Sequence, residues 1–412
     1  MIKYPNDLNI IFDRLREHNA TIIIVGGYIR DFLLDANIQD SKDIDIEIYN
    51  ISSYEKLQNI LKEFGEVNNV GKSFGVCKLC LETLDLDFTL PRIDSKIASG
   101  HKGFDVKVLK DLNFKEASKR RDFTINAIGY NIATKEILDP HNGIADLKKK
   151  NLKMVDAKTF VQDPLRVLRA IQFCARFELK MDKELFLQCS KMIKQDMLLE
   201  LPKERVYGEI KKLLLKSNKP SIGFELLNEL QALEYFSKIS FNFLSLDALA
   251  KENITKIKTK EILMLALICY KLNQEQTQDF ISNLSNEKEL AFRVTTLVVN
   301  LPIALKLSKK DFSDYELYKL ATHINIEEIN ILLKVIYGVD KKIFMRAKEL
   351  NILNHKLPNI IKGRDLIVLG LKESKNFKTI LDAAYEAQMH NEFNSHENAK
   401  EWLLANYIRL SV

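Results

Sequence analysis

Residues 21–31 read TIIIVGGYIRD, and residues 43–49 read DIDIEIY. The first stretch opens with a β-branched run that predicts a strand over residues 21–25. Two glycines end that strand, and residues 28–34 predict a helix directly after them. The second stretch alternates polar and apolar residues with period two, which is typical of a strand with one buried face.

Two further short strands are predicted, at residues 73–81 and 84–90. The first 150 residues therefore predict an α/β or α+β domain. Beyond that point helical periodicity takes over and continues to the C-terminus. Examples of this periodicity are residues 206–215, 259–272, 326–337 and 375–390. Since single hydrophobic cores stop growing near about 250–300 residues, we expect more than one domain.

The composition is that of an ordinary globular protein, with 46% hydrophobic and 29% charged residues. The net charge of +6 permits a polyanionic partner without requiring one. The five cysteines, an odd number, fit a reducing compartment better than a disulfide framework. The N-terminus lacks the apolar segment of a signal peptide, and no stretch of about 18 apolar residues occurs. We therefore expect a cytoplasmic protein without a membrane segment.

The turn after the first strand suits a phosphate-bearing ligand. Gly26 and Gly27 let the backbone approach a ligand closely, since neither residue carries a Cβ atom. The helix that follows offers free N–H groups and the positive end of its dipole. Arg30, in the first turn of this helix, can add a charge-assisted hydrogen bond to a triphosphate oxygen.

Asp43 and Asp45 lie two residues apart on a predicted strand, so both carboxylates point to the same face. Adjacent carboxylates repel each other unless a positive charge lies between them. Mg²⁺ fits there because it binds a few carboxylates together with substrate phosphate oxygens. A carboxylate on a neighbouring strand would complete such a site, with Asp87 as the first candidate and Asp85 as the second.

Two later segments carry further charged residues. KRRDFTINA, residues 119–127, joins a basic cluster to an apolar run, and a site for a triphosphate needs several cations. DPLRVLR, residues 163–169, begins with a good helix start. Asp163, Arg166 and Arg169 fall on one side of that helix and could contact a base edge. The same pattern suits a solvent-exposed amphipathic helix that Asp163 merely caps, and the residues alone do not decide.

Eight motifs in order resemble those of one known family, the bacterial CCA-adding tRNA nucleotidyltransferases and poly(A) polymerases of the polymerase-β-like superfamily. The resemblance is dense from residue 21 to about residue 215 and is weaker near IKGRDL, residues 361–366. The motifs are GGYIRD (26–31), DIDIEIY (43–49), PRIDSK (91–96), GHKGF (100–104), KRRDFTINAIGYN (119–131), DPHNGIADLKKK (139–150), DPLRVLRAIQF (163–173) and KERVYGEIKKLL (203–214).

The resemblance implies an α+β fold class, with an N-terminal polymerase-β-like head built on a mixed sheet with helices. All-helical neck, body and tail regions would follow. We expect residues 1–150 to form the catalytic head and residues 151–218 to form a neck that contains the helix reading the nucleobase. Residues 219–412 would form the body and tail that bind tRNA.

The resemblance also implies residue roles. Asp43 and Asp45 would be catalytic and would ligate Mg²⁺. Gly27 and Arg30 would bind the incoming triphosphate, and Arg121 would contact the nucleotide.

In the neck, Asp163 and Arg166 would read the Watson–Crick edge of CTP or ATP, with Arg169 beside them. The chain departs from the family at Gln172, where an arginine is common. Helix projection puts Gln172 at the edge of the polar face.

The implied reaction is Mg²⁺-dependent addition of CCA to the 3′ end of tRNA from CTP and ATP, without a nucleic-acid template and with release of pyrophosphate. A poly(A) polymerase and an enzyme that adds only CC or only A are the nearest alternatives. Residues 92–119, the segment linked in the family to switching from CTP to ATP, do not look shortened, which favours full CCA addition. An inactive RNA-binding protein is a more distant alternative. Nothing implies a stable protein partner.

Overall fold

The computed structural model describes residues 2–35, 43–68, 75–82, 84–96, 104–108, 112–233, 242–339, 341–371 and 376–408. The chain forms two compact units, Met1–Tyr235 and Phe236–Val412, and each is described by itself.

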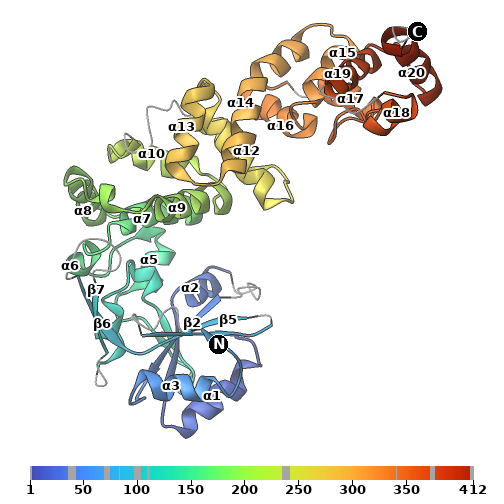
Figure 1. Ribbon diagram of the computed structural model, residues 1–412. Helices are drawn as coiled ribbons and strands as arrows, with labels where there is room; N and C mark the ends of the chain where they lie inside the picture. Colours follow the sequence, from blue (N-terminus) through green and yellow to red (C-terminus); the bar gives the residue numbers. More distant parts are fainter. Residues whose placement is uncertain are drawn as a thin grey trace. The chain divides into compact units, whose positions relative to one another are not determined.

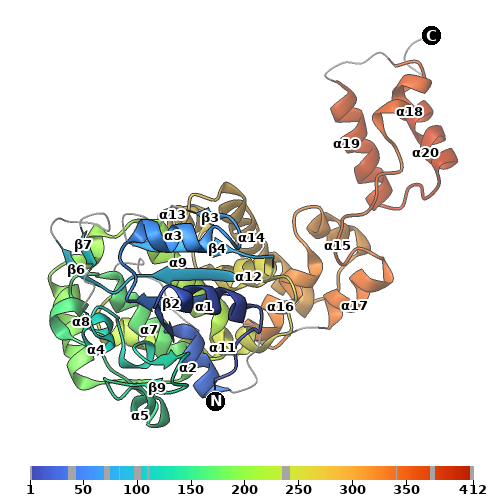
Figure 2. The ribbon, with the colours of Figure 1, turned by 90° about the horizontal axis from the view of Figure 1, so that it is seen from below.

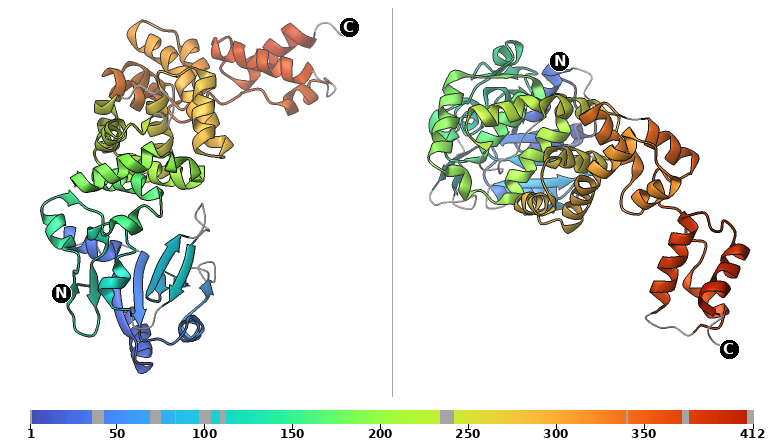
Figure 3. Two further views of the ribbon diagram at one scale, coloured as in Figure 1. Left: turned by 90° about the vertical axis from the view of Figure 1, so that its left-hand side faces the viewer. Right: turned by 90° about the horizontal axis from the view of Figure 1, so that it is seen from above.

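A mixed sheet of seven strands, in the order β3-β4-β5-β2-β1-β8-β9, forms the centre of the first unit (Figures 1 and 3). β2 and β5 are parallel, and the other neighbouring pairs are antiparallel. The strands are β1 (Thr21–Val25), β2 (Asp43–Tyr49), β3 (Val67–Asn68), β4 (Val76–Cys80), β5 (Asp85–Thr89), β8 (Gly129–Asn131) and β9 (Ile137–Leu138). The mixed sheet and the α+β class of this unit are confirmed.

The two faces of the sheet differ in chemistry because side chains alternate along each strand. Ile22 and Ile24 of β1 are buried on the face that also takes Ile44 and Ile46 of β2. Helices α1 (Leu8–Glu17) and α3 (Tyr54–Leu61) contact each other. α1 also contacts β1, and α3 contacts β4, as Figure 2 shows.

On the opposite face, Ile23 and Val25 pack in a small cluster with Ala117 of α4 (Phe114–Ser118). Asp45 lies opposite Val25, and Glu47 lies opposite Ile23, so both acidic side chains share the face of this cluster. The face that carries the acidic residues is therefore the one against which residues 114–122 fold.

Short elements and then helices follow the sheet within the first unit. β6 (Arg92–Lys96) and β7 (Phe104–Val108) form a separate hairpin. The helices and strands after residue 140 include α5 (Gly143–Lys148), β10 (Asn151–Leu152), α6 (Ala157–Phe160), α7 (Leu165–Phe177), β11 (Lys180–Met181), α8 (Lys183–Lys194), α9 (Lys203–Lys216) and α10 (Ser221–Glu229). α7 packs against α9 and α10 and buries Val167, Leu168 and Ile171.

The described part of the second unit is helical. Its helices are α11 (Phe243–Lys251), α12 (Ile257–Cys269), α13 (Gln274–Leu284), α14 (Lys288–Lys309), α15 (Asp314–Ala321), α16 (Ile326–Tyr337), α17 (Lys342–Glu349), α18 (Gly363–Val368), α19 (Asn376–Met389) and α20 (His396–Leu403). α18, α19 and α20 share a core that contains Leu366, Ile380 and Leu403 (Figure 2).

α14 is one described helix that is long and apolar enough to cross a membrane, judged by length and composition only. The mean hydropathy of this helix distinguishes it, although Arg293, Asn300 and Lys306 interrupt its apolar residues. Half of its most apolar window is buried inside the protein. α12, α13 and α16 pack against it, as neighbours pack against a core helix.

The predicted strands at residues 21–25 and 43–49 are confirmed with the same bounds. The strands predicted at 73–81 and 84–90 are shorter, at Val76–Cys80 and Asp85–Thr89, and residues 73, 74 and 83 lie outside the described residues. The proposed division of the chain at residues 150 and 218 stays a prediction.

Candidate active site

Four aspartates occupy paired positions where β2 and β5 run parallel. The strand register places Asp43 opposite Asp85 and Asp45 opposite Asp87. Side chains of directly paired residues point to the same face, so Asp45 and Asp87 project side by side. The edge of this acidic group is open to solvent, because Asp43 and Asp45 are exposed.

The side chain of Asp87 has a buried oxygen atom whose hydrogen-bonding capacity is not used by any described residue. Its Oδ1 atom is buried and has no hydrogen-bond partner among the described residues. Burial raises the pKa of the Asp87 carboxyl, and the neighbouring charges of Asp45 and Asp43 raise it further. A buried carboxylate oxygen beside two like charges is costly unless a cation compensates it. The donor set therefore fits a divalent metal ion.

Within the described ranges, no three side chains of Asp, Glu, His or Cys lie close enough together to enclose a metal ion. A site built from one or two carboxylates plus substrate oxygens matches Mg²⁺, which usually keeps several ligands from water or phosphate. Asp43, Asp45 and Asp87 are thus the candidates for metal binding, and the assignment stays a prediction.

Asp87 and Asp85 form a matched pair for a test. Asp85 faces Lys78, with 3.5 Å between Nζ and Oδ2, so its charge already has a partner. We expect Asp87→Asn to weaken Mn²⁺ binding by at least about tenfold, because it removes a negative charge beside Asp45 and replaces one carboxylate oxygen with an NH₂ group. We expect Asp85→Asn to leave that affinity within about twofold. Titration calorimetry with Mn²⁺ measures both, and equal losses would contradict the assignment.

Gly26 brings the turn close to the acidic face. Its φ of +76° lies in the left-handed region that favours glycine. A Cβ atom at this position would lie 3.0 Å from both Arg121 Nη1 and Asp45 Oδ2. The predicted Gly26, Arg121 and Asp45 therefore come together at one point, where a cation and a carboxylate flank the turn between β1 and α2 (Gly27–Leu34).

Glu47 organises the basic side of the site, although the sequence analysis did not single it out. Its side chain is fully buried. Its Oε1 accepts hydrogen bonds from Arg120 Nη2 at 2.8 Å and from Arg121 Nη2 at 2.9 Å, and Oε2 accepts one from the Tyr49 hydroxyl. Burial alone would raise the pKa of Glu47, but Arg121 and Arg120 lower it to about 2. The period-two pattern that marked Asp43 and Asp45 also includes Glu47, so a signal was present.

Arg30, which was expected to bind phosphate, instead makes its hydrogen bonds within the protein. Its guanidinium is buried and donates to Asp31 Oδ1 and, at 2.6 Å, to Asn126 Oδ1. Its Cζ atom lies 5.1 Å from the ring centroid of Phe173 and 4.7 Å from that of Phe177. Arg30 therefore ties α2 to α7, and its contact with a triphosphate stays a prediction.

The charged start of α7 makes internal contacts. Asp163 Oδ1 accepts a hydrogen bond from the Leu165 N–H at 3.2 Å, and Oδ2 pairs with Arg205 Nη2 of α9 at 3.3 Å. Arg166 donates to the backbone carbonyls of Thr159 and Arg120. Asp163 and Arg166 are thus held by different partners, and their roles in base reading stay predictions.

Arg169 is bound to the KRRD segment. Its Nε donates to Asp122 Oδ2 at 2.7 Å, and its guanidinium lies over the ring of Phe173. Burial alone would raise the pKa of Asp122, but Arg169 and the hydrogen bond from Asn126 lower it to about 2. Residues 120–122 therefore link the acidic sheet face to α7 through Glu47 on one side and Arg169 and Arg166 on the other.

Gln172 is buried, with 2% of its surface exposed, so its predicted place at the edge of the polar face was wrong. α7 packs against α9 and α10 and also against the short strands β10 and β11. These neighbours cover more of the helix surface than a helix with one buried and one exposed face would have covered. The Nε2 atom of Gln172 has no hydrogen-bond partner in the part of the chain that the structure describes.

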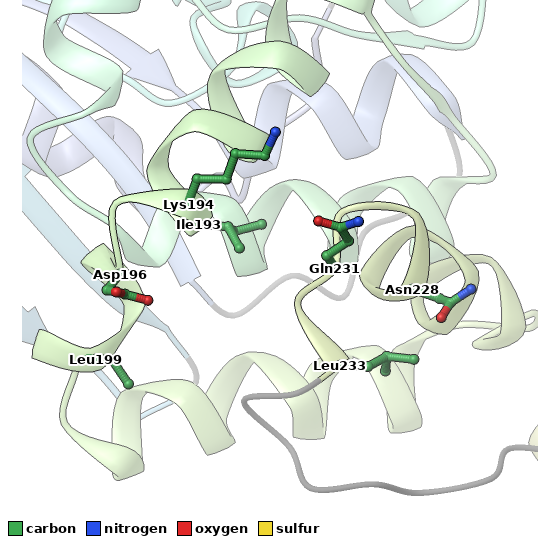
Figure 4. A pocket seen from close by; sticks show the side chains of 7 residues that line it. All are labelled: Ile193, Lys194, Asp196, Leu199, Asn228, Gln231 and Leu233. Carbon is green, nitrogen blue, oxygen red and sulfur yellow. The ribbon is translucent and has the colours of Figure 1, made fainter.

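A separate hollow of about 830 Å³ lies among α8, the turn after it and the end of α10 (Figure 4). Ile193, Leu199 and Leu233 supply apolar lining, and Lys194, Asp196, Asn228 and Gln231 supply polar lining. The predicted site residues are not among these lining residues, so the hollow is distinct from the acidic face.

Two family models match segments within residues 22–240. Residues 22–153 match the poly A polymerase head domain, and residues 178–240 match the probable RNA and SrmB-binding site of polymerase A. The first match covers the sheet with its acidic face, and the second covers α8, α9 and α10.

The chain is also similar to curated proteins. It is 34% identical over 215 residues to a multifunctional CCA protein of Psychromonas ingrahamii. The aligned region covers 52% of this chain and 49% of the relative. The chain spans about half of the length of several curated relatives that it matches. A CCA-adding enzyme of Lactococcus lactis is 26% identical over 403 residues, which cover 94% of this chain and 93% of the relative.

Among solved structures, one of a CCA-adding enzyme with ATP has a TM-score of 0.73 at 21% identity. The match covers 97% of this chain and 94% of that chain. The fold of this chain is therefore that of the solved structure, and in its described residues a mixed sheet is followed mainly by helices.

Proposed function

Since the chain belongs to the family of nucleotidyltransferases that carry the poly A polymerase head domain, we propose that it adds CCA to the 3′ end of tRNA. CTP and ATP are its substrates in this proposal, and pyrophosphate is the second product. The protein itself replaces a nucleic-acid template. A cytoplasmic location suits this role and the five free cysteines.

One observation supports the chemistry most directly: Asp45 lies beside Asp87 on one strand face, with Arg121 at the adjoining turn. Carboxylates that share a face and an arginine next to a glycine turn are the parts that a nucleoside triphosphate with a divalent cation requires. The choice of tRNA and of CCA is supported by the relatives, one of which matches along nearly its whole length.

We infer that Mg²⁺ is the cation and that Asp43 and Asp45 supply its protein ligands, with Asp87 as the candidate for a further one. When bound, it would polarise the phosphate and lower the pKa of the attacking hydroxyl. Arg121 would offset charge on the triphosphate, and the backbone at Gly26 would leave room for it.

The reaction needs no protein nucleophile. The 3′-hydroxyl oxygen of the RNA forms a bond to the α-phosphorus, the bond from that phosphorus to the bridging oxygen breaks, and pyrophosphate leaves. The hydroxyl proton passes to solvent. The side chains position the two substrates and compensate charge, which is most of what catalysis of phosphoryl transfer demands.

Selection between CTP and ATP would rest on Asp163 and Arg166, with Arg169 beside them. Arg166 currently donates to the carbonyls of Thr159 and Arg120, so base reading requires its guanidinium to exchange these partners for the base. We expect Arg166→Ala to blur the choice between CTP and ATP by about tenfold or more, since a bidentate contact contributes about 1–3 kcal/mol of discrimination. Single-turnover incorporation with each nucleotide measures this, and unchanged selectivity would count against the role.

Arg176 provides the matched control. It lies on the same helix, pairs with Asp31 at 3.6 Å and lies over the ring of Phe177. Arg176→Ala removes an arginine from the same helix, but from its last turn rather than its first. We expect selectivity to survive this change even if the overall rate falls.

The decisive experiment supplies a tRNA that lacks its 3′ end with labelled CTP and ATP, separately and together, and sizes the products. Addition of three nucleotides supports CCA addition. Two or one would identify a CC-only or A-only enzyme, and a long ladder with ATP alone would identify a poly(A) polymerase. No product with any nucleotide, from protein that still binds tRNA, would identify an inactive RNA-binding protein.

A further inference from the structure

α14 exposes apolar side chains along one side although it lies in the core of its unit. Its buried side chains, which include Leu290, Val294 and Leu301, pack among neighbouring helices. On the other side Phe292 is 70% exposed, Val299 is 41% exposed and Ile303 is 50% exposed. Three large apolar side chains in one line on a helix surface mark an interaction site more often than scattered ones do.

The exposed side chains follow a heptad spacing. Glu289, Phe292, Thr296, Val299, Ile303 and Lys306 are separated by steps of three and four residues. This spacing is that of the a and d positions of a coiled coil, where each side chain faces a partner helix. Thr296 also presents its methyl group, because its hydroxyl donates to the Phe292 carbonyl at 2.8 Å. We call these six residues the α14 seam.

The α14 seam is complementary to itself when two copies run antiparallel. Phe292 then faces Ile303 of the second copy, and Thr296 faces Val299. At each end Glu289 faces Lys306, so both outer contacts join opposite charges. Neither Glu289 nor Lys306 has an ion-pair partner among the residues that the structure describes. We propose that α14 pairs antiparallel with α14 of a second copy of this chain through the α14 seam.

The seam suits a second copy better than a membrane or RNA. A helix that lies on a membrane presents a wide apolar face flanked by Lys and Arg, whereas this seam is narrow and contains Glu289 and Thr296. An RNA-binding face is rich in cations, and the seam contains one lysine against one glutamate. Self-pairing accounts for the apolar centre and the charged ends together.

Cross-linking tests the register. In a Cys80→Ser background, which removes the exposed thiol, Phe292→Cys and Ile303→Cys are prepared as separate full-length proteins. We expect a mixture of the two to form a disulfide-linked dimer under mild oxidation. Each protein alone should not, because equivalent residues would lie about 16 Å apart along the axis at a rise of about 1.5 Å per residue. Equal cross-linking of each protein with itself would overturn the antiparallel register.

Mass measurements test the pairing without cysteines. Light scattering over a range of concentrations should show the mass rising from 47.6 kDa toward twice that value. Phe292→Glu should keep the protein at the monomer mass at all concentrations. Leu244→Glu, which changes an equally apolar side chain that is 85% exposed on α11, should pair like the unaltered protein.

Charge reversal distinguishes specific pairing from nonspecific hydrophobic association. Glu289→Lys alone and Lys306→Glu alone should each weaken pairing, and the double variant should restore it. A protein that stays monomeric at every concentration overturns the proposal. Co-flotation of that monomer with lipid vesicles, lost in Phe292→Glu, would assign the seam to a membrane surface instead.

Discussion

Asp45→Asn should reduce nucleotide incorporation by about 10³-fold or more while the protein stays folded. The change removes a negative charge from the open edge of the acidic face, where Asp45 lies beside Asp87 and next to Gly26. Loss of a group that compensates charge in phosphoryl transfer costs several kcal/mol of transition-state stabilisation. Incorporation of labelled CTP into tRNA, measured in single turnovers, gives the rate.

Stability provides the internal check for Asp45→Asn. Because Asp45 raises the pKa of Asp87 through repulsion, removal of its charge should leave the thermal midpoint without metal unchanged or slightly higher. Asp13→Asn, on the exposed surface of α1, is the control and should keep full activity. A fully active Asp45→Asn protein would end the assignment of the acidic face as the catalytic site.

Glu47→Gln should destabilise the protein strongly near neutral pH. The fully buried carboxylate accepts hydrogen bonds from Arg120 and Arg121, and without its charge two largely buried guanidinium groups lose their partner. The pKa of Glu47 lies at about 2, against an ordinary value of 4.5. A difference of this size corresponds to about 3 kcal/mol at neutral pH. Denaturant unfolding at pH 7 measures the loss.

The effect of Glu47→Gln should depend on pH in a defined direction. A carboxyl group whose pKa is lowered by folding adds stability that is fully present above its unfolded pKa and is lost as the pH falls through its folded pKa. For Glu47 the loss therefore runs from about pH 4.5 down to about pH 2. The difference in unfolding free energy between the two proteins should shrink across this window. A difference that stays constant with pH would show that packing, rather than charge, explains the effect.

Glu47→Gln should also change substrate binding, because Arg121 would no longer be held beside Gly26 and Asp45. We expect the KM for CTP and ATP to rise more than kcat falls when activity is measured well below the unfolding temperature. Glu63→Gln is the matched control, since Glu63 also pairs with an arginine, Arg14, but on the exposed surface. It should change neither stability nor KM appreciably.

Sequence periodicity anticipated the local elements of the head well. The β-branched run and the period-two run predicted the strands at 21–25 and 43–49 with their observed bounds. The two glycines predicted the turn, and Gly26 adopts the positive φ that such a turn requires. These features depend only on residues that are neighbours in the chain. The alternation of side chains and the backbone freedom of glycine can therefore be inferred from the order of the residues.

The sequence suggested Asp87 only as a candidate because its place depends on strand pairing. Period two shows which residues share a face within one strand, but it does not show which strands become neighbours or in which register. The parallel register of β2 and β5 decides that Asp45 meets Asp87 and that Asp43 meets Asp85. Their side-chain partners then distinguish Asp85 from Asp87. Asp85 pairs with Lys78, whereas one carboxylate oxygen of Asp87 has no hydrogen-bond partner among the described residues.

The sequence by itself determined the acidic strand, the glycine turn, the basic segment and the mainly helical character of the described residues after 150. The short strands β10 and β11 depart from the all-helical prediction there. The tertiary structure alone decided that Glu47 is buried between Arg120 and Arg121, that Arg30 is enclosed by Phe173 and Phe177, and that Gln172 is covered. The physical reason is range: period and turn chemistry act over a few residues, whereas burial and ion pairing join segments far apart in the chain.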